Sequence, residues 1–159
     1  MAAIQMMKGY LPKSKIRFVN VSELTALGVG DETVGSSDEL LDKHFTKDKG
    51  VIYNFHGYPQ TIKKLLFDYS GSNRIKVNGY LEEGSTTSPF DMQTRNRTSR
   101  YHLVVDMAQC FLDQKVITAA EFKKIEKDIE KRLKTHRDYI IKHGDDPKEL
   151  AEWQWCLLK

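Results

Sequence analysis

The fold is decided by residues 51–92, VIYNFHGYPQTIKKLLFDYSGSNRIKVNGYLEEGSTTSPFDM. The first five residues form a short apolar run typical of a strand, and HGYP then turns the chain. Residues 60–69 predict a helix, and residues 73–81 alternate apolar with polar side chains, which is the period of a half-buried strand. The inward face of that helix would carry Ile62, Leu65, Leu66 and Tyr69. The stretch therefore predicts one strand, helix, strand unit.

The residues before this unit predict three more elements and a loop. Residues 2–8 contain helix formers up to Gly9, and residues 15–21, KIRFVNV, are rich in β-branched and aromatic side chains typical of a strand. Three glycines in residues 28–35 favour a surface loop. Ser36 and Glu39 have the spacing of a capping box for a helix over residues 37–45, on which His44 is expected to be half-buried.

The residues after this unit predict helices. Thr98 or Ser99 can cap a helix, on which an apolar stripe recurs at helical spacing. A second capping box, Thr118 to Glu121, begins a long amphipathic helix that ends at Gly144, and a last turn follows Asp146-Pro147. The stripe of the first helix is Leu103, Met107, Cys110 and Phe111. The stripe of the long helix is Phe122, Ile125, Ile129, Leu133, His136 and Ile140.

Strands that alternate with helices favour an α/β fold with three layers, in which helices flank a mainly parallel or mixed sheet. The helices after residue 98 would form a C-terminal extension that flanks this sheet. At 159 residues the chain has the length of a single domain, so we expect residues 1–159 to form one.

The composition limits the kind of partner. With 40% hydrophobic and 30% charged residues and a net charge of +3, the chain is typical of a globular protein with neither a membrane span nor a basic surface for nucleic acid. Cys110 and Cys156 lie far apart and outside any metal-binding spacing, so no metal site is expected. The first residues, MAAIQMMKGYLP, do not have the pattern of a signal peptide, which favours a cytoplasmic location.

Two loops carry the candidate site residues. His56, Gly57 and Tyr58 follow the first strand at its carboxyl end, where open α/β sheets place ligands. His56 could transfer protons there, although a histidine that ties the turn to a neighbouring carbonyl is the commoner case. The polar loop after the second strand holds Glu83 and four hydroxyls, which could bind phosphate or, more commonly, satisfy backbone groups. These hydroxyls belong to Ser85, Thr86, Thr87 and Ser88.

Several segments together resemble the C-terminal domain of the phosphoketolases, thiamine-diphosphate enzymes related to transketolase. The resemblance covers about Pro12 to Trp155 and rests on segments in the family's order. They are KIRFVNV at 15–21, VIYNFHGYP at 51–59, GYLEEGSTTSPFDM at 79–92, RYHLVVD at 100–106 and HGDDPKELAEWQW at 143–155.

The resemblance implies a role without catalytic groups. Phosphoketolases cleave xylulose 5-phosphate, and often fructose 6-phosphate, with inorganic phosphate to give acetyl phosphate and a shorter aldose phosphate. Thiamine diphosphate and magnesium are held by the two preceding domains, whose motifs do not occur here, so no catalytic residue, cofactor or metal is expected in this chain. Its expected partners are those other domains and further copies of the whole enzyme.

The resemblance also implies a fold like the transketolase C-terminal domain, N-terminally truncated, without its first strand. An isolated chain of this kind suggests two alternatives: a non-catalytic interaction module, which would use the sheet edge and the residues from Trp153 to Leu158, or an effector-binding module. The effector would be a nucleotide or phosphorylated metabolite near His56 and Thr86. Turnover of a sugar phosphate by this chain would count against a role without catalytic groups. A soluble monomer that captures no partner would count against an interaction module, and the absence of heat on ligand addition would count against an effector-binding module.

Overall fold

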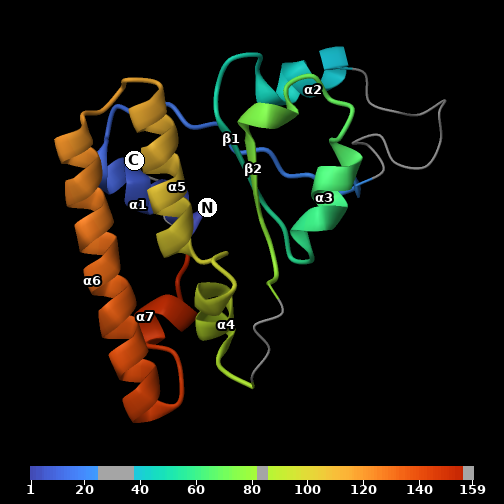
Figure 1. Ribbon diagram of the computed structural model, residues 1–159. Helices are drawn as coiled ribbons and strands as arrows, with labels where there is room; N and C mark the ends of the chain where they lie inside the picture. Colours follow the sequence, from blue (N-terminus) through green and yellow to red (C-terminus); the bar gives the residue numbers. More distant parts are fainter. Residues whose placement is uncertain (25–37, 82–85, 156–159) are drawn as a thin grey trace. The chain divides into compact units, whose positions relative to one another are not determined.

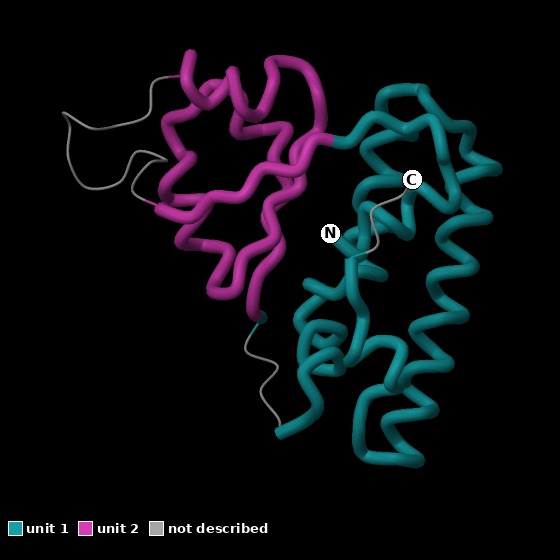
Figure 2. The backbone as a smooth tube through the Cα atoms, turned by 180° about the vertical axis from the view of Figure 1, so that it is seen from behind, with its two compact units in different colours: residues 1–16, 81–159 teal, residues 17–80 magenta. Residues whose placement is uncertain are grey.

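The computed structural model describes residues 1–24, 38–81 and 86–155. The chain folds as two compact units, one formed by residues 17–80 and the other by residues 1–16 together with 81–159 (Figure 2). We call the first the sheet unit and the second the helical unit. The prediction of a single domain stays a prediction, because two compact units can belong to one domain.

The sheet unit contains two parallel strands, β1 (Val51–Asn54) and β2 (Ile75–Asn78) (Figure 1). Val51 is paired with Ile75, and Asn54 with Asn78. Helix α2 (Asp38–Phe45), helix α3 (Pro59–Leu65) and the 3-10 turn η2 (Ser72–Arg74) belong to the same unit. Its buried core consists of Leu41, Phe45, Ile62, Leu66 and Tyr69.

The strand, helix, strand unit predicted from residues 51–92 is confirmed, with shorter elements than expected. Helix α3 ends at Leu65 rather than Tyr69, yet Leu66 and Tyr69 are still buried in the core with Ile62, because consecutive turns continue the chain after the helix. The expected capping box at Ser36 lies outside the described residues, as do the glycine loop and Cys156. His44 is exposed, contrary to our expectation, because Leu41 and Phe45 form the inward face of α2.

The strand predicted over residues 15–21 is wrong. These residues form no strand, and Phe18 is 56% exposed. Alternating apolar residues form a strand only where a neighbouring strand supplies hydrogen bonds, and that requirement is not visible in the local pattern. The sheet of the described residues accordingly has two strands. The α/β class is confirmed at this level, while the three-layer, transketolase-like arrangement stays a prediction.

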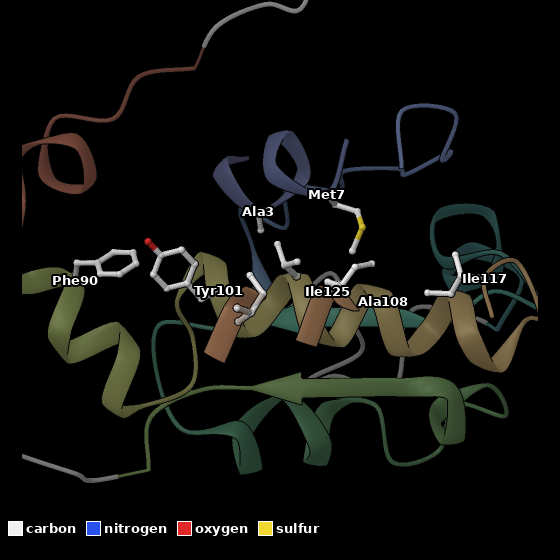
Figure 3. Close-up of a cluster of buried hydrophobic side chains, with 9 residues drawn as sticks. Ala3, Met7, Phe90, Tyr101, Ala108, Ile117 and Ile125 are labelled. Atoms are coloured by element: carbon white, nitrogen blue, oxygen red, sulfur yellow. The ribbon is translucent and has the colours of Figure 1, made fainter. Parts of the chain in front are cut away.

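The helical unit contains α1 (Ala2–Tyr10), α4 (Pro89–Arg95), α5 (Arg100–Asp113), α6 (Ala119–His143) and α7 (Lys148–Ala151). Helix α5 packs against both α1 and α6. Figure 3 shows their side chains meeting in one buried cluster. The cluster consists of Ala3, Met7, Phe90, Tyr101, Val104, Ala108, Ile117, Ile125 and Ile129.

The predicted helices of this unit are confirmed, with two corrections. Helix α1 continues through Gly9 to Tyr10 instead of ending at Lys8. On α5 the fully buried line is Tyr101, Val104 and Ala108, whereas the predicted stripe is only half-buried. The stripe was misjudged because α5 is covered from two sides, which turns a different line of the helix toward the centre.

Helix α6 follows the prediction at both ends. The Thr118 hydroxyl accepts the Glu121 N–H at 3.2 Å, and the Glu121 carboxylate accepts the Thr118 N–H at 2.8 Å. At the other end Gly144 has a φ of 71°, a left-handed conformation that suits glycine. In the described parts of the chain, no helix is long and apolar enough to cross a membrane.

Candidate functional site

The two strands of the sheet unit bring His56 and Tyr80 together. Each residue lies two positions beyond the end of its strand, and parallel strands end at the same edge of a sheet. The Tyr80 hydroxyl lies 2.9 Å from Nε2 and 3.0 Å from Nδ1 of His56, so it bonds one ring nitrogen at a time. The rings meet edge to face at 4.9 Å. His56 is exposed, and its predicted place at the carboxyl end of a strand is observed.

The backbone beside this pair is held in close contact. The Tyr80 N–H donates to the Gly57 carbonyl at 2.8 Å, which carries the pairing of the two strands beyond their ends. A Cβ atom on Gly79 would lie 2.4 Å from the Gly57 oxygen and 2.9 Å from Pro59 Cδ. Glycine at position 79 is therefore required by space, and Gly57 contributes its carbonyl to the contact between the two chain segments.

Tyr58 has a structural position next to these residues. It is the N-cap residue of α3, with an extended backbone, and its side chain is 51% exposed. Its neighbour Pro59 begins the helix, which is the position where proline is best tolerated. Tyr58 is thus placed at the same edge as His56 by the turn that begins α3.

Two of the candidate residues in the polar loop, Thr86 and Thr87, belong to the described part of the chain, and the phosphate-binding hypothesis for this loop stays a prediction. Glu83 and Ser85 lie outside the described residues, and Thr86 is exposed. The Thr87 hydroxyl donates to Asp91 Oδ2 at 2.6 Å. Thr87 therefore uses its hydroxyl in a hydrogen bond within the helical unit, at the beginning of α4.

Asp146 is the centre of a buried network that the sequence analysis missed. Its Oδ1 accepts the Ser88 hydroxyl at 2.7 Å and lies 3.1 Å from His136 Nε2, while its Oδ2 accepts the Phe90 N–H at 2.7 Å. Asp146 and His136 are almost fully buried, and the His136 ring meets Phe90 edge to face. The expectation that His136 packs in the core is confirmed. The available sequence signal was Ser88-Pro89, a capping residue before a proline, whose partner lies 58 residues away.

A second buried carboxylate, Asp91, lies on the first turn of α4. Burial alone would raise the pKa of Asp91, but hydrogen bonds from Thr87 and from Arg95 Nε at 2.6 Å outweigh it and hold the pKa below its ordinary value. Asp91 is therefore ionised at neutral pH and bound to a guanidinium four residues along its helix.

These carboxylates are not arranged to hold magnesium and a diphosphate. Magnesium needs carboxylate oxygens that are free to face it. Asp91 Oδ2 accepts hydrogen bonds from Thr87 and Arg95, and the two oxygens of Asp146 accept from Ser88 and from the Phe90 backbone. Among the described residues, no three His, Cys, Asp or Glu side chains gather as a metal site. The carboxylates in the part of the chain that the structure describes therefore do not fit the magnesium ion and diphosphate that the resemblance implies for the whole enzyme.

The architecture is an α/β unit with a parallel strand pair, joined to a helical unit built around α5 and α6, and comparison with known proteins defines the family. The family model described as XFP C-terminal domain matches residues 1–155. Probable phosphoketolase 1 of Rhizobium meliloti is 40% identical over 156 residues, which are 98% of this chain and 19% of that protein. Probable phosphoketolases of Chlorobaculum tepidum and Nitrosomonas europaea are each 38% identical over the same shares.

The chain belongs to the phosphoketolase C-terminal domain family, as the resemblance predicted. It spans about a fifth of the length of the curated relatives it matches, with 19% of each covered.

Proposed function

We propose that this chain is the C-terminal portion of a phosphoketolase, and that it contributes architecture and subunit contacts rather than reacting groups. The whole enzyme would cleave xylulose 5-phosphate, and fructose 6-phosphate where it accepts that substrate, with inorganic phosphate. The products would be acetyl phosphate, water and an aldose phosphate two carbons shorter than the substrate.

The observation that carries this proposal is the extent of the match. The similarity covers 98% of this chain but 19% of a relative that is named a probable phosphoketolase. The catalytic groups of such a protein can therefore belong to the remaining four fifths of its length. The polar residues at the candidate loops support the same reading, because His56 is bonded to Tyr80 and Thr87 to Asp91.

The proposal includes the partners and cofactors of the whole enzyme. Thiamine diphosphate and a magnesium ion would be held by the other domains, as the family resemblance implies, and the internal hydrogen bonds of Asp91 and Asp146 are consistent with this. This chain would pack against those domains and contribute to contacts between copies of the enzyme in the cytoplasm. Its sequence pI near 8.7 and mixed surface charge do not favour nucleic acid as a further partner.

The experiment is to find which polypeptide carries this sequence in the source cell and whether it is active. Native extract is separated by size, each fraction is searched by mass spectrometry for the peptide at residues 51–63, VIYNFHGYPQTIK, and the same fractions are assayed for acetyl phosphate formed from xylulose 5-phosphate. We expect the peptide in a polypeptide roughly five times as long, eluting with the activity. A peptide found only at 18.4 kDa, in fractions that make no acetyl phosphate, would overturn the proposal.

A further inference from the structure

The helical unit contains a surface cavity that the proposed function does not use. Its volume is about 310 Å³, and it lies between α5, α6 and α7. Its walls combine aromatic and apolar side chains with charged groups. Sites for small organic ligands have volumes of about 300–1,000 Å³, so this cavity is suited to a ligand at the small end of that range.

The wall of the cavity includes a tyrosine. Tyr101 belongs to α5 and is 7% exposed as a residue, and its hydroxyl has no hydrogen bond to any described residue. Burial raises the pKa of Tyr101, so the phenol is protonated at neutral pH and can donate. A polar ligand in the cavity would give this hydroxyl a hydrogen-bond acceptor in place of water.

The charges around the cavity are two positive and two negative. Arg132 donates through Nε to Asp128 at 2.8 Å, so these two neutralise each other on α6. Lys131 on α6 and Glu149 on α7 form no ion pair with any described residue. The cavity therefore offers one available cation and one available anion, and its charge sums to zero. A ligand with several negative charges, such as a phosphate ester, would gain little here because Glu149 opposes the single available cation, Lys131.

We propose that this cavity binds a free α-amino acid with an apolar or aromatic side chain. The carboxylate group of the ligand faces Lys131 and the Tyr101 hydroxyl, and its ammonium group faces Glu149. Its side chain packs against Tyr139 and Leu150, which line the same space. Such a ligand carries one charge of each sign on a small apolar body, which matches the size, the charges and the walls of the cavity.

The test is a titration of the 159-residue chain followed by proton–nitrogen correlation spectra. The probes are L-phenylalanine, L-leucine and L-methionine, with inorganic phosphate as the competing anion. N-Acetyl-L-phenylalanine removes the positive charge of the probe, and L-phenylalaninamide removes the negative charge. We expect at least one amino acid to shift the resonances of α6 and α7 with saturation, and each analogue to bind about tenfold more weakly.

Charge-removing variants test the assignment of each end. Lys131→Gln should weaken amino-acid binding about fivefold to tenfold and leave the affinity for the amide analogue nearly unchanged. Glu149→Gln should weaken amino-acid binding by a similar factor and leave the affinity for the N-acetyl analogue nearly unchanged. Lys134→Gln and Glu130→Gln change exposed α6 residues that do not line the cavity, so both should bind as the parent does.

Three results would overturn the inference. One is a folded chain whose spectrum is unchanged by all three amino acids at about 10 mM, a concentration that detects even weak ligands. The second is equal binding of the analogues, and the third is a tighter response to inorganic phosphate. The spectrum of each variant shows whether it is folded. Because the readout is binding to this chain, its failure is distinguishable from a failure of the phosphoketolase proposal.

Discussion

Asp146 links three parts of the helical unit through one carboxylate. It accepts hydrogen bonds from Ser88 and from the Phe90 backbone at the start of α4, and it faces His136 on α6. The Phe90 N–H can only donate, so an asparagine would keep its carbonyl oxygen there and turn its NH₂ group toward Ser88 and His136, which would both have to accept instead. We therefore expect Asp146→Asn to lower the free energy of unfolding by about 3 kcal/mol, because the carboxylate is lost from a buried network that must rearrange around a neutral amide.

Urea unfolding monitored by circular dichroism measures that loss. Asp138→Asn is the matched control, since Asp138 is an exposed residue of α6, and it should change stability by less than about 0.5 kcal/mol. If the two variants unfolded at the same urea concentration, the network would not be a source of stability.

In the sheet unit, Arg74 has a comparable role through a single guanidinium group. Nη1 donates to the carbonyls of Phe45 and Lys49 at 3.0 and 2.7 Å, and Nη2 donates to the Tyr69 hydroxyl at 2.6 Å and to the Thr46 carbonyl. These bonds hold the turn after α2, where Thr46 has a φ of 61°.

Arg74→Lys should lower the stability of the sheet unit by about 2 kcal/mol, because one ammonium group cannot reach acceptors spread over the plane of a guanidinium. Arg17→Lys provides the control within the same unit. Arg17 also donates to two backbone carbonyls, but it is exposed, so its loss should cost less than about 1 kcal/mol. If thermal unfolding showed the same loss of stability in Arg74→Lys and Arg17→Lys, burial would not be what makes the Arg74 contacts important.

At the scale of elements, alanine substitutions of two glycines in the helical unit should change the stability of the chain in opposite directions. Gly9 is exposed inside α1, and a Cβ atom there would meet nothing within 4 Å, so Gly9→Ala should stabilise the chain by about 0.5 kcal/mol. Gly144 ends α6 with a φ of 71°, so Gly144→Ala should destabilise by about 1 kcal/mol. Equilibrium urea unfolding of the two variants checks both signs, and a loss of stability in Gly9→Ala would show that the end of α1 is misjudged.

Helices α1 and α6 are joined by a hydrogen bond that should depend on alkaline pH. Tyr10 donates to Asp128, and burial followed by this bond raises the pKa of Tyr10 from 10.0 to about 12. Between these two values the phenol ionises in the unfolded chain but stays protonated in the folded one. Stability from this group is therefore complete below pH 10.0 and is lost as the pH rises toward 12.

Tyr10→Phe removes this titration. Urea midpoints of the parent and the variant across that pH range should converge as the pH rises, because ionisations common to both proteins cancel in the comparison. A constant difference between the two midpoints would show that the bond to Asp128 does not shift the Tyr10 pKa in the folded chain.

The elements that sequence reasoning predicted are those whose signals are local. The ends of α6 follow from Thr118, Glu121 and Gly144, each of which acts within one turn of its own helix. The strand expected over residues 15–21 failed because strand formation depends on a neighbour elsewhere in the chain. The buried line of α5 was misplaced for a related reason, since the covering helices α1 and α6 decide which side faces inward.

At the scale of the whole molecule, the family was accessible from sequence, whereas the polar networks were not. The ordered segments beginning with KIRFVNV identify the phosphoketolase family regardless of the local structure they form. The carboxylate at Asp146 meets a hydroxyl 58 residues earlier, and no periodicity links the two. His56 and Tyr80 are an intermediate case, because the parallel pairing of their strands was expected and brings them to one edge.

The two units should differ in how readily they open. Among the described residues, the helical unit has the larger buried cluster, contributed by α1, α4, α5 and α6, whereas the sheet unit has one pair of four-residue strands and a buried core of five residues. A two-stranded sheet is marginal unless other elements cover it. Local opening follows the weakest packing, so the sheet unit should open without global unfolding.

Native-state hydrogen exchange followed by mass spectrometry tests this difference. Amides of β1 and β2 should exchange with protection factors about tenfold or more below those of the buried amides in α5 and α6. Asp146→Asn weakens only the helical unit, so it should reduce the difference in protection factors between the two units. Arg74→Lys weakens only the sheet unit, so it should increase that difference. Equal protection in the parent, unchanged in both variants, would mean that the chain opens as one cooperative body in spite of its two cores.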